Sequence, residues 1–286
     1  MRNIMNKKPA VGIVALGMVG DQLRRWFASK GHPMYAYDKF KGVGALSDLH
    51  AADVIFLCLP TPHSKKHVWG VDLSSFELVA KFFTHPKTFV VKSTVPPGTT
   101  AHLQKRFPRH RFLHNPEFLT ESTAWYDFIH PVAQLVGYTH KSKGQAARVL
   151  AMLPRSKTEA ALSSEATEIF KYARNAYFAN KVIFANHVYD LAGAFGVSYD
   201  SLKDIMKKDP WIGANHLEVV HRGYRGFGGK CLPKDLKTLI RVMRARHVDA
   251  EVFEAVDRSN GKLLSKQKLE KTLNTYWLNN TNAREA

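Results

Sequence analysis

A short apolar run, a tight turn and a helix follow one another near the start of the chain, and this order limits the folds that the chain can adopt. Residues 10–14 read AVGIV and residues 15–20 read ALGMVG, and the apolar residues of DQLRRWFASKG at 21–31 recur at helical spacing before a glycine. A strand that leads through a glycine turn into a helix begins a βαβ unit. The sequence therefore predicts a parallel sheet with helices on its faces.

Further apolar runs continue this alternation. MYAYD ends at Asp38, and the helical segment LSSFELVAKFF separates two strand-like runs at 53–59 and 88–94. Residues 112–118 and 131–137 are expected to supply the last strands and their loops. Continuously apolar strands are typical of parallel sheets that are covered on both faces. We predict an α/β fold that begins with a Rossmann-type, doubly wound parallel sheet.

The pattern changes near residue 160. Residues 163–196 form one long helical pattern, which Ser163 or Ser164 could cap and Gly196 closes. Shorter helices are predicted at 198–208, 234–246 and 249–275. The predicted parts are a dinucleotide-binding domain (1–160), a helical central domain with the loop around Cys231 (161–260), and a C-terminal helix and tail (261–286).

Composition narrows the classes of protein that fit. The 286-residue chain is 45% hydrophobic, and its apolar runs are far shorter than the roughly 20 residues that span a membrane. No apolar segment typical of a secretion signal follows the basic start, so we expect a cytoplasmic protein without membrane contact. The 2 cysteines give no disulfide framework, and the 14 histidines are scattered, so we expect no metal site.

The net charge of +18 would attract polyanions, acidic surfaces or phosphorylated small molecules. The basic residues are spread along the chain and form no dense tract interleaved with aromatic residues. Binding to nucleic acid is therefore the less favoured interpretation. A solvated basic surface is the simplest alternative.

The glycine turn indicates a cofactor site. Ala15, Leu16, Gly17, Met18, Val19 and Gly20 occupy the fingerprint window, with alanine in place of the first glycine. Asp38 follows about twenty residues later at the end of the second predicted strand, where an acid can accept ribose hydroxyls and favours NAD over NADP. Lys39 could weaken that preference. A glycine turn in an unrelated α/β protein remains the alternative at this point.

Five further segments occur along the chain. LPTP at 59–62 with GVDLSS at 70–75, KSTVPPGTT at 92–100, NPEFLTES at 115–122, EIFKYARNAYFANKV at 168–182 and GFGGKCLPKD at 226–235 follow in that order. Read together, they resemble the UDP-glucose and GDP-mannose dehydrogenase family. The resemblance implies NAD-dependent, four-electron oxidation of a nucleotide-sugar alcohol to a uronic acid, with UDP-glucose the favoured substrate, in nucleotide-sugar metabolism and polysaccharide biosynthesis.

Cys231 suits the chemistry that this reaction needs. A thiolate that adds to the intermediate aldehyde forms a thiohemiacetal, whose oxidation gives a thioester that water can cleave. Lys230, Lys234 and the glycine-rich loop would stabilise the thiolate. The alternative, a small buried apolar residue, fits Cys58 better because Cys58 lies within an apolar run.

The resemblance implies roles for the remaining polar residues. Lys171 and Asn175 lie four residues apart on one helix, where they would stabilise a developing oxyanion, although such a pair also fits a solvated face. Glu121 and Asp235 match acid–base positions, and Thr94 would help to position a water molecule. The cofactor residues implied are Ala15, Gly17, Met18, Val19, Gly20, Asp38, Lys39, Pro60, Thr61, Thr94, Glu121 and Lys234. The substrate residues implied are Glu117, Phe118, Leu119, Lys171, Asn175, Phe227 and Gly228.

The chain also departs from the family pattern. Family members continue into a third domain that grips the nucleotide, whereas here a helix and a polar tail are predicted soon after Asp235. Trp211 and Lys181 stand where arginines are common, and Arg222 and Arg225 could compensate. The family implies a homodimer through the central helical domain. An altered substrate, or a catalytically weak protein that binds a partner through its basic surface, remains an alternative function.

Overall fold

The computed structural model describes residues 8–64, 67 and 69–269, and these form two compact units. The first unit contains the chain up to Thr61 together with Asp72–Lys171. The second contains Pro62–Val71 and the chain from Tyr172 onward. The predicted domain boundary near residue 160 stays a prediction.

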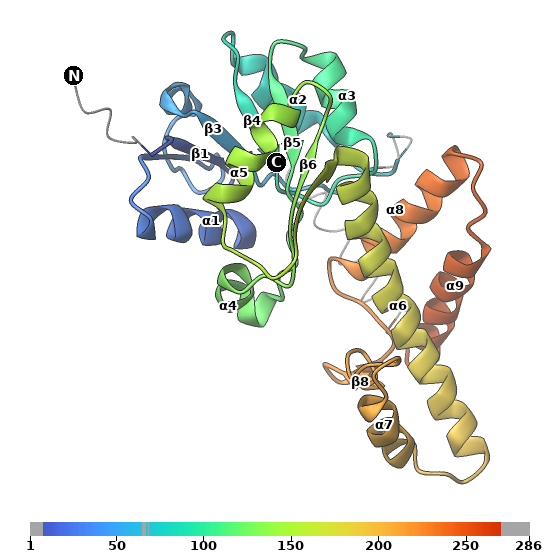
Figure 1. The fold of residues 1–286 in the computed structure, drawn as a ribbon. Coiled ribbons are helices and arrows are strands. Elements are labelled where there is room, and N and C mark those ends of the chain that lie inside the picture. The colour runs from blue at the N-terminus through green and yellow to red at the C-terminus, as the bar shows by residue number, and fades with distance from the viewer. Residues whose placement is uncertain (1–7, 65–66, 68, 270–286) are drawn as a thin grey trace. The chain divides into compact units, whose positions relative to one another are not determined.

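The first unit is built on one seven-stranded sheet with the strand order β2-β1-β3-β4-β5-β6-β7 (Figure 1). Its strands are β1 (Val11–Val14), β2 (Met34–Tyr37), β3 (Val54–Leu57), β4 (Thr88–Val91), β5 (Arg111–His114), β6 (Gln134–Tyr138) and β7 (Glu159–Ser163). The first five strands are parallel, as the alternating strands and helices predict. β6 runs antiparallel to β5, and β7 is parallel to β6.

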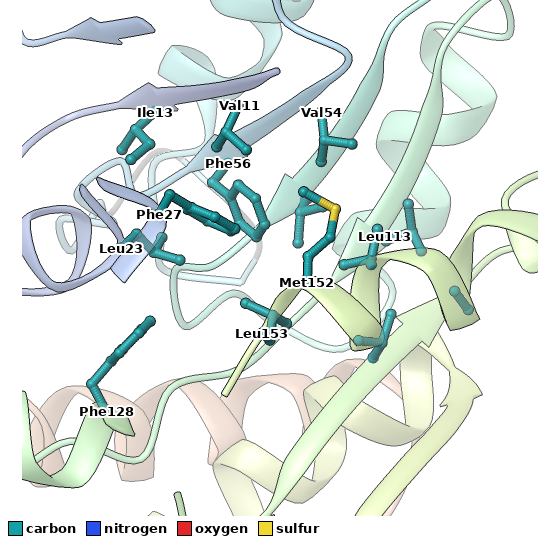
Figure 2. Packing of buried hydrophobic residues seen from close by; sticks show 14 of the residues in the cluster. Val11, Ile13, Leu23, Phe27, Val54, Phe56, Leu113, Phe128, Met152 and Leu153 are labelled. Carbon is teal, nitrogen blue, oxygen red and sulfur yellow. The ribbon is translucent and has the colours of Figure 1, made fainter. Parts of the chain in front are cut away.

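Helices cover both faces of this sheet. They are α1 (Met18–Ser29), α2 (Ser74–Phe82), α3 (Thr99–Arg106), α4 (Ala124–Ile129) and α5 (Ala146–Met152), with short 3-10 helices η1 (Leu46–Ala51), η2 (Glu121–Thr123) and η3 (Lys143–Gln145). Alternate residues of a single strand serve different faces: Val54 and Phe56 join one apolar cluster, shown in Figure 2, and Ile55 and Leu57 join the other. This two-sided burial explains why the strands are continuously apolar.

Helix α6 (Ser164–Ala194) is a single 31-residue helix. It begins in the first unit and continues into the second. Gly196 follows its end with a left-handed φ of 68°, which suits a residue without a side chain. The long helix predicted over 163–196 is therefore present.

The second unit is helical, with one small hairpin. It contains α7 (Tyr199–Lys208), the hairpin of β8 (Val220–His221) and β9 (Tyr224–Arg225), α8 (Leu232–Ala245) and α9 (Glu251–Lys266). Its core joins side chains of α6, α8 and α9, among them Tyr172, Ala176, Ile183, Leu236, Ile240 and Leu263. The helix predicted over 249–275 ends at Lys266, because the backbone turns to a positive φ of 59° at Lys268. Of the C-terminal helix and tail predicted over 261–286, the part from residue 270 lies outside the described residues.

Residues 8–64, 67 and 69–269 contain neither a candidate membrane span nor a candidate metal cluster. None of the helices in these ranges is both long and apolar enough to cross a membrane. Within the same ranges, no three His, Cys, Asp or Glu side chains come together as metal ligands would.

Candidate functional site

The turn after β1 has the geometry of a phosphate-binding loop. Ala15 has a φ of 69°, a region that disfavours any residue with a Cβ, and its N–H donates to the carbonyl of Tyr37 at 2.8 Å. A Cβ on Gly20 would lie 2.0 Å from the carbonyl oxygen of Ala15, so close packing of α1 against the turn requires glycine there. Gly17 caps α1 and has open space around it. The turn therefore presents the first N–H groups of α1 beside open space.

Asp38, just after β2, is held by the backbone around it. Its Oδ2 accepts the N–H of Leu16 at 2.8 Å, and its Oδ1 accepts the N–H groups of Phe40 and Lys41, both at 3.0 Å. Burial alone would raise the pKa of this carboxyl, but the three hydrogen bonds and the Lys41 charge lower it overall. Because a carboxylate has about four acceptor positions, about one remains for a ribose hydroxyl.

These features fit a bound dinucleotide. The N-terminus of α1 suits a pyrophosphate, and Asp38 keeps capacity for one hydroxyl. Lys39 is exposed, whereas Lys41, which the sequence reasoning missed, donates from Nζ to the carbonyl of Leu16 at 2.6 Å. The other predicted cofactor positions in the first unit are exposed or half-buried: Met18, Val19, Pro60, Thr61, Thr94 and Glu121.

The loop after β4, which carries Thr94, is anchored on both sides by buried groups. Lys92 donates from Nζ to Oδ1 of Asn115 at 2.7 Å, and burial lowers its pKa to about 8. Glu168 of α6 accepts the N–H groups of Gly98 and Thr100 at 2.6 and 2.8 Å, at the start of α3. Burial raises the pKa of Glu168 to about 8 although these hydrogen bonds lower it. Sequence reasoning missed both anchors, although Lys92 and Glu168 lie in segments that carry the family resemblance.

Lys171 forms a buried ion pair with Glu117. Its Nζ donates to Oε1 of Glu117 at 2.9 Å and to the Glu117 carbonyl at 2.7 Å, and it lies 5.5 Å from the centre of the Phe118 ring. Burial would raise the pKa of Glu117, but the Lys171 charge and the N–H of Leu119 lower it overall. The structure therefore brings together Glu117, Phe118, Leu119 and Lys171, all predicted substrate residues.

Asn175, Asp235 and Lys234 form a second network, in the helical unit. Nδ2 of Asn175 donates to Oδ2 of Asp235 at 2.6 Å, and Nζ of Lys234 donates to Oδ1 at 2.5 Å. Asp235 is almost fully buried, with 1% of its surface exposed, so the two donors compensate its lost hydration. The structure therefore unites three more of the predicted residues.

Cys231 lies at the N-terminal cap of α8, one turn before Asp235. Its side chain is exposed, whereas Cys58 is held in a site that raises its pKa to about 12 through burial. The N-terminus of a helix favours the negative charge of a thiolate. Of the residues just before it, Phe227 is buried and Gly228 is half-buried. The exposed thiol of Cys231, rather than the half-buried thiol of Cys58, therefore has the surroundings of a reactive group.

The departures from the family pattern have distinct environments. Trp211 is 92% exposed, and Nζ of the buried Lys181 donates to the carbonyls of Ile212 and Gly213 just after it. The guanidinium of Arg225 is engaged by Asn186 and Asp190 of α6, at 3.0 and 2.6 Å. Arg225 is therefore occupied within its own unit, which does not favour the suggestion that it compensates for Trp211.

Two parts of the chain match models of one family. Residues 38–152 match the NAD binding domain of the UDP-glucose/GDP-mannose dehydrogenase family, and residues 165–262 match its central domain. The chain belongs to the UDP-glucose/GDP-mannose dehydrogenase family. This membership confirms the fold class and the NAD cofactor that the sequence predicts, whereas the roles of individual residues stay predictions.

Relatives of this dehydrogenase family member carry two different names. UDP-glucose 6-dehydrogenase of Rickettsia conorii is 32% identical over 222 residues, which cover 75% of this chain and 50% of the relative. GDP-mannose 6-dehydrogenase of Pseudomonas putida is 30% identical over 232 residues, which cover 74% of this chain and 51% of the relative. The solved UDP-glucose dehydrogenase of Pyrobaculum islandicum matches with a TM-score of 0.78 at 25% identity, covering 92% of this chain and 70% of that one. The chain thus spans about half the length of the curated relatives it matches.

Proposed function

We propose that this protein oxidises the primary alcohol of a nucleotide sugar to a carboxylate in two NAD-dependent steps, with UDP-glucose as the favoured substrate. The observation that carries the proposal is the exposed Cys231 thiol at the cap of α8, one turn before the buried Asp235 and its partners Asn175 and Lys234. NAD, when bound, accepts one hydride in each step. The chain's own residues hold the substrate, the intermediates and the protons.

The first step removes a hydride from the alcohol carbon while the hydroxyl proton passes to a base, which gives an aldehyde. Lys171 and Asn175 are the donors proposed for the oxygen that becomes negative. Asn175 commits one amide N–H to Asp235 and keeps its second N–H for this task. Lys171 is held by its ion pair with Glu117, which places its ammonium group to stabilise a developing anion.

The second step begins when the Cys231 thiolate forms a bond to the aldehyde carbon and gives a thiohemiacetal. Loss of the second hydride and of the hydroxyl proton converts this adduct to a thioester. Water then breaks the carbon–sulfur bond, releasing the uronic acid and the thiol. We assign activation of that water to Asp235, with Thr94 and Glu121 as further acid–base or positioning groups, because these residues match the family's motifs.

The test of this proposal is the yield of NADH with a panel of UDP- and GDP-sugars. Two NADH per sugar with the wild-type protein, and loss of turnover in Cys231→Ser, are expected. Cys58→Ser is the matched control, since that half-buried thiol has a raised pKa and should leave turnover unchanged. Absence of turnover with every sugar, together with tight and salt-sensitive binding to nucleic acid, would contradict the proposal in favour of the basic binding protein.

A changed substrate preference is the second candidate, and Trp211 favours it. An indole that is 92% exposed cannot form the bidentate contacts that an arginine makes with a diphosphate, but it can stack on a base. The sugar panel separates this candidate from the first when it is repeated with Trp211→Arg. If the substrate preference has changed, this substitution should raise kcat/KM for UDP-glucose relative to the sugar that the wild-type protein prefers.

We also propose a homodimer formed through α6. Tyr177, Phe184 and Leu191 recur at seven-residue intervals on this helix and are 54%, 49% and 59% exposed, although all three are large and apolar. Such spacing places them along one face, as at a helix pairing surface. Sedimentation should show a dimer that Phe184→Glu converts to a monomer. A wild-type monomer at micromolar concentration would rule this out.

A further inference from the structure

The backbone leading to Cys231 is held by two amide side chains from α9 and its end. Oδ1 of Asn260 accepts the N–H of Phe227 at 2.8 Å, and Nδ2 of Asn260 donates to the Phe227 carbonyl at 2.9 Å. Gln267 repeats the arrangement on Arg225, with distances of 2.9 and 3.0 Å. Each amide thus makes both hydrogen bonds that a neighbouring strand would make.

The spacing on the two sides explains why this arrangement works. Arg225 and Phe227 are two residues apart, and the N–H and carbonyl groups of both meet the two amide side chains. Asn260 and Gln267 are seven residues apart, about two helical turns, so they lie along one face of α9. A helix here takes the place of a sheet neighbour for the outer edge of β9 and the residues after it.

The contact is close and leaves little freedom. Gly226 lies between the two clamped residues with a φ of 94°, and a Cβ there would lie 2.7 Å from Oδ1 of Asn260. Phe227 is buried, and its backbone groups would lose hydrogen-bonding partners without Asn260. The segment therefore enters the glycines of 228–229 from a fixed position.

We propose that Asn260 and Gln267 are positioning residues that set the place of the Cys231 thiol, an inference that rests on the proposed function for its effect on catalysis. Neither side chain needs to touch the substrate. Asn260 fixes the peptide groups four residues before the thiol, and α8 fixes those after it. Without the amide pair, the glycine-rich stretch between these anchors would sample many positions.

The test measures the thiol directly in the full chain. Asn260→Leu removes both hydrogen bonds to Phe227 with a side chain of similar size, and Asn260→Asp keeps the acceptor for the Phe227 N–H. Tyr199→Phe is the control. It removes one buried hydrogen bond of the same unit, to the carbonyl of Leu217, away from this loop. The rate of Cys231 alkylation by iodoacetamide is followed against pH by peptide mass spectrometry, beside kcat and KM.

We expect a shifted alkylation profile in Asn260→Leu, a smaller shift in Asn260→Asp and none in Tyr199→Phe. If Cys231 is the nucleophile, kcat falls about tenfold or more in Asn260→Leu, as displaced reacting groups cause, while KM changes little. Equal profiles for Asn260→Leu and wild type, or an equal shift in Tyr199→Phe, would overturn the inference. If Asn260→Leu fails to fold, Asn260→Asp and Gln267→Ala decide by the same criterion. A shifted profile in a protein without dehydrogenase activity would uphold the positioning and refute the proposed function.

Discussion

Two glycine-containing loops each lead into the start of a helix, and they are held in place by different kinds of group. The turn at Ala15–Gly20 comes from a central strand and is held by backbone groups of β2 and by Asp38. The loop before Cys231 comes from the two-residue strand β9 and is held by side-chain amides of Asn260 and Gln267. Strand β2 holds the first loop partly through its backbone, which every residue has. Helix α9 and its end hold the second loop through two particular side chains. Single side-chain changes outside the loops, at Asp38 for the first and at Asn260 or Gln267 for the second, therefore test how each loop is held.

The largest loss of stability is expected at Gly20, where the first loop packs too closely to accept a side chain. Gly20→Ala places a Cβ 2.0 Å from the Ala15 carbonyl oxygen, so α1 must shift, and the free energy of unfolding should fall by about 3 kcal/mol. NAD affinity should fall as well. Gly17→Ala is the matched control for stability alone, since its Cβ meets no protein atom within 4 Å. Urea unfolding and NAD titration measure both, and an unchanged midpoint in Gly20→Ala would contradict the described packing.

Asp38→Asn tests the acid that organises the same loop. The amide cannot accept all three N–H groups, and its own NH₂ opposes one of them, so a loss of about 2 kcal/mol is expected at pH 7. Because the folded-state pKa of Asp38 is lowered, its stabilisation is complete above the unfolded pKa of about 3.9 and is lost as pH falls through the folded value. The variant should be less sensitive to acid. Urea unfolding from pH 7 downward checks this, and parallel curves for the two proteins would refute it.

A gain in stability is expected from Ala15→Gly. The φ of 69° is unfavourable for alanine and free for glycine, so the variant should be more stable by about 1 kcal/mol. Ala36→Gly in β2, where φ is not positive, should instead lose about 0.5 to 1 kcal/mol. Thermal unfolding of both variants gives the answer, and the same sign for the two changes would show that Ala15 is not strained.

The smallest effect sharpens the contrast between the loops. Gln267→Ala should reduce global stability by less than about 1 kcal/mol, because the lost partners of Arg225 can be replaced by water. Hydrogen exchange should nevertheless accelerate at the Arg225 amide and stay slow at the Phe227 amide, which Asn260 still holds. Equal acceleration at both amides would mean that the two clamps act as one.

Much of the first unit could be predicted because its signals are local. Apolar runs of strand length alternate with amphipathic helices, and the glycine turn and Asp38 directly follow the first and the second strand. The antiparallel direction of β6 could not be predicted, since a short apolar strand has the same pattern in either direction. β7 was missed because its residues are exposed or half-buried and lack an apolar run.

The sequence predicts which residues form the candidate site, but not which of their side chains pair with one another. The motifs identified Lys171, Asn175 and Asp235, but only tertiary structure shows that Lys171 pairs with Glu117 while Asn175 binds Asp235. Asn260 and Gln267 look like solvated polar residues on a helix, since their partners are backbone groups 33 and 42 residues away. Contacts at such separations leave no periodic signal in the sequence.

These separations also order events during synthesis. The segment with Arg225 and Phe227 leaves the ribosome before the helix that holds it, and its last clamp forms only after Gln267 has emerged. Until then the glycines before Cys231 are not held at their N-terminal side, and the thiol can react with other molecules from a range of positions. On a nascent chain, alkylation of Cys231 should therefore change once Gln267 has left the ribosome, because both ends of the glycine-rich stretch are then held.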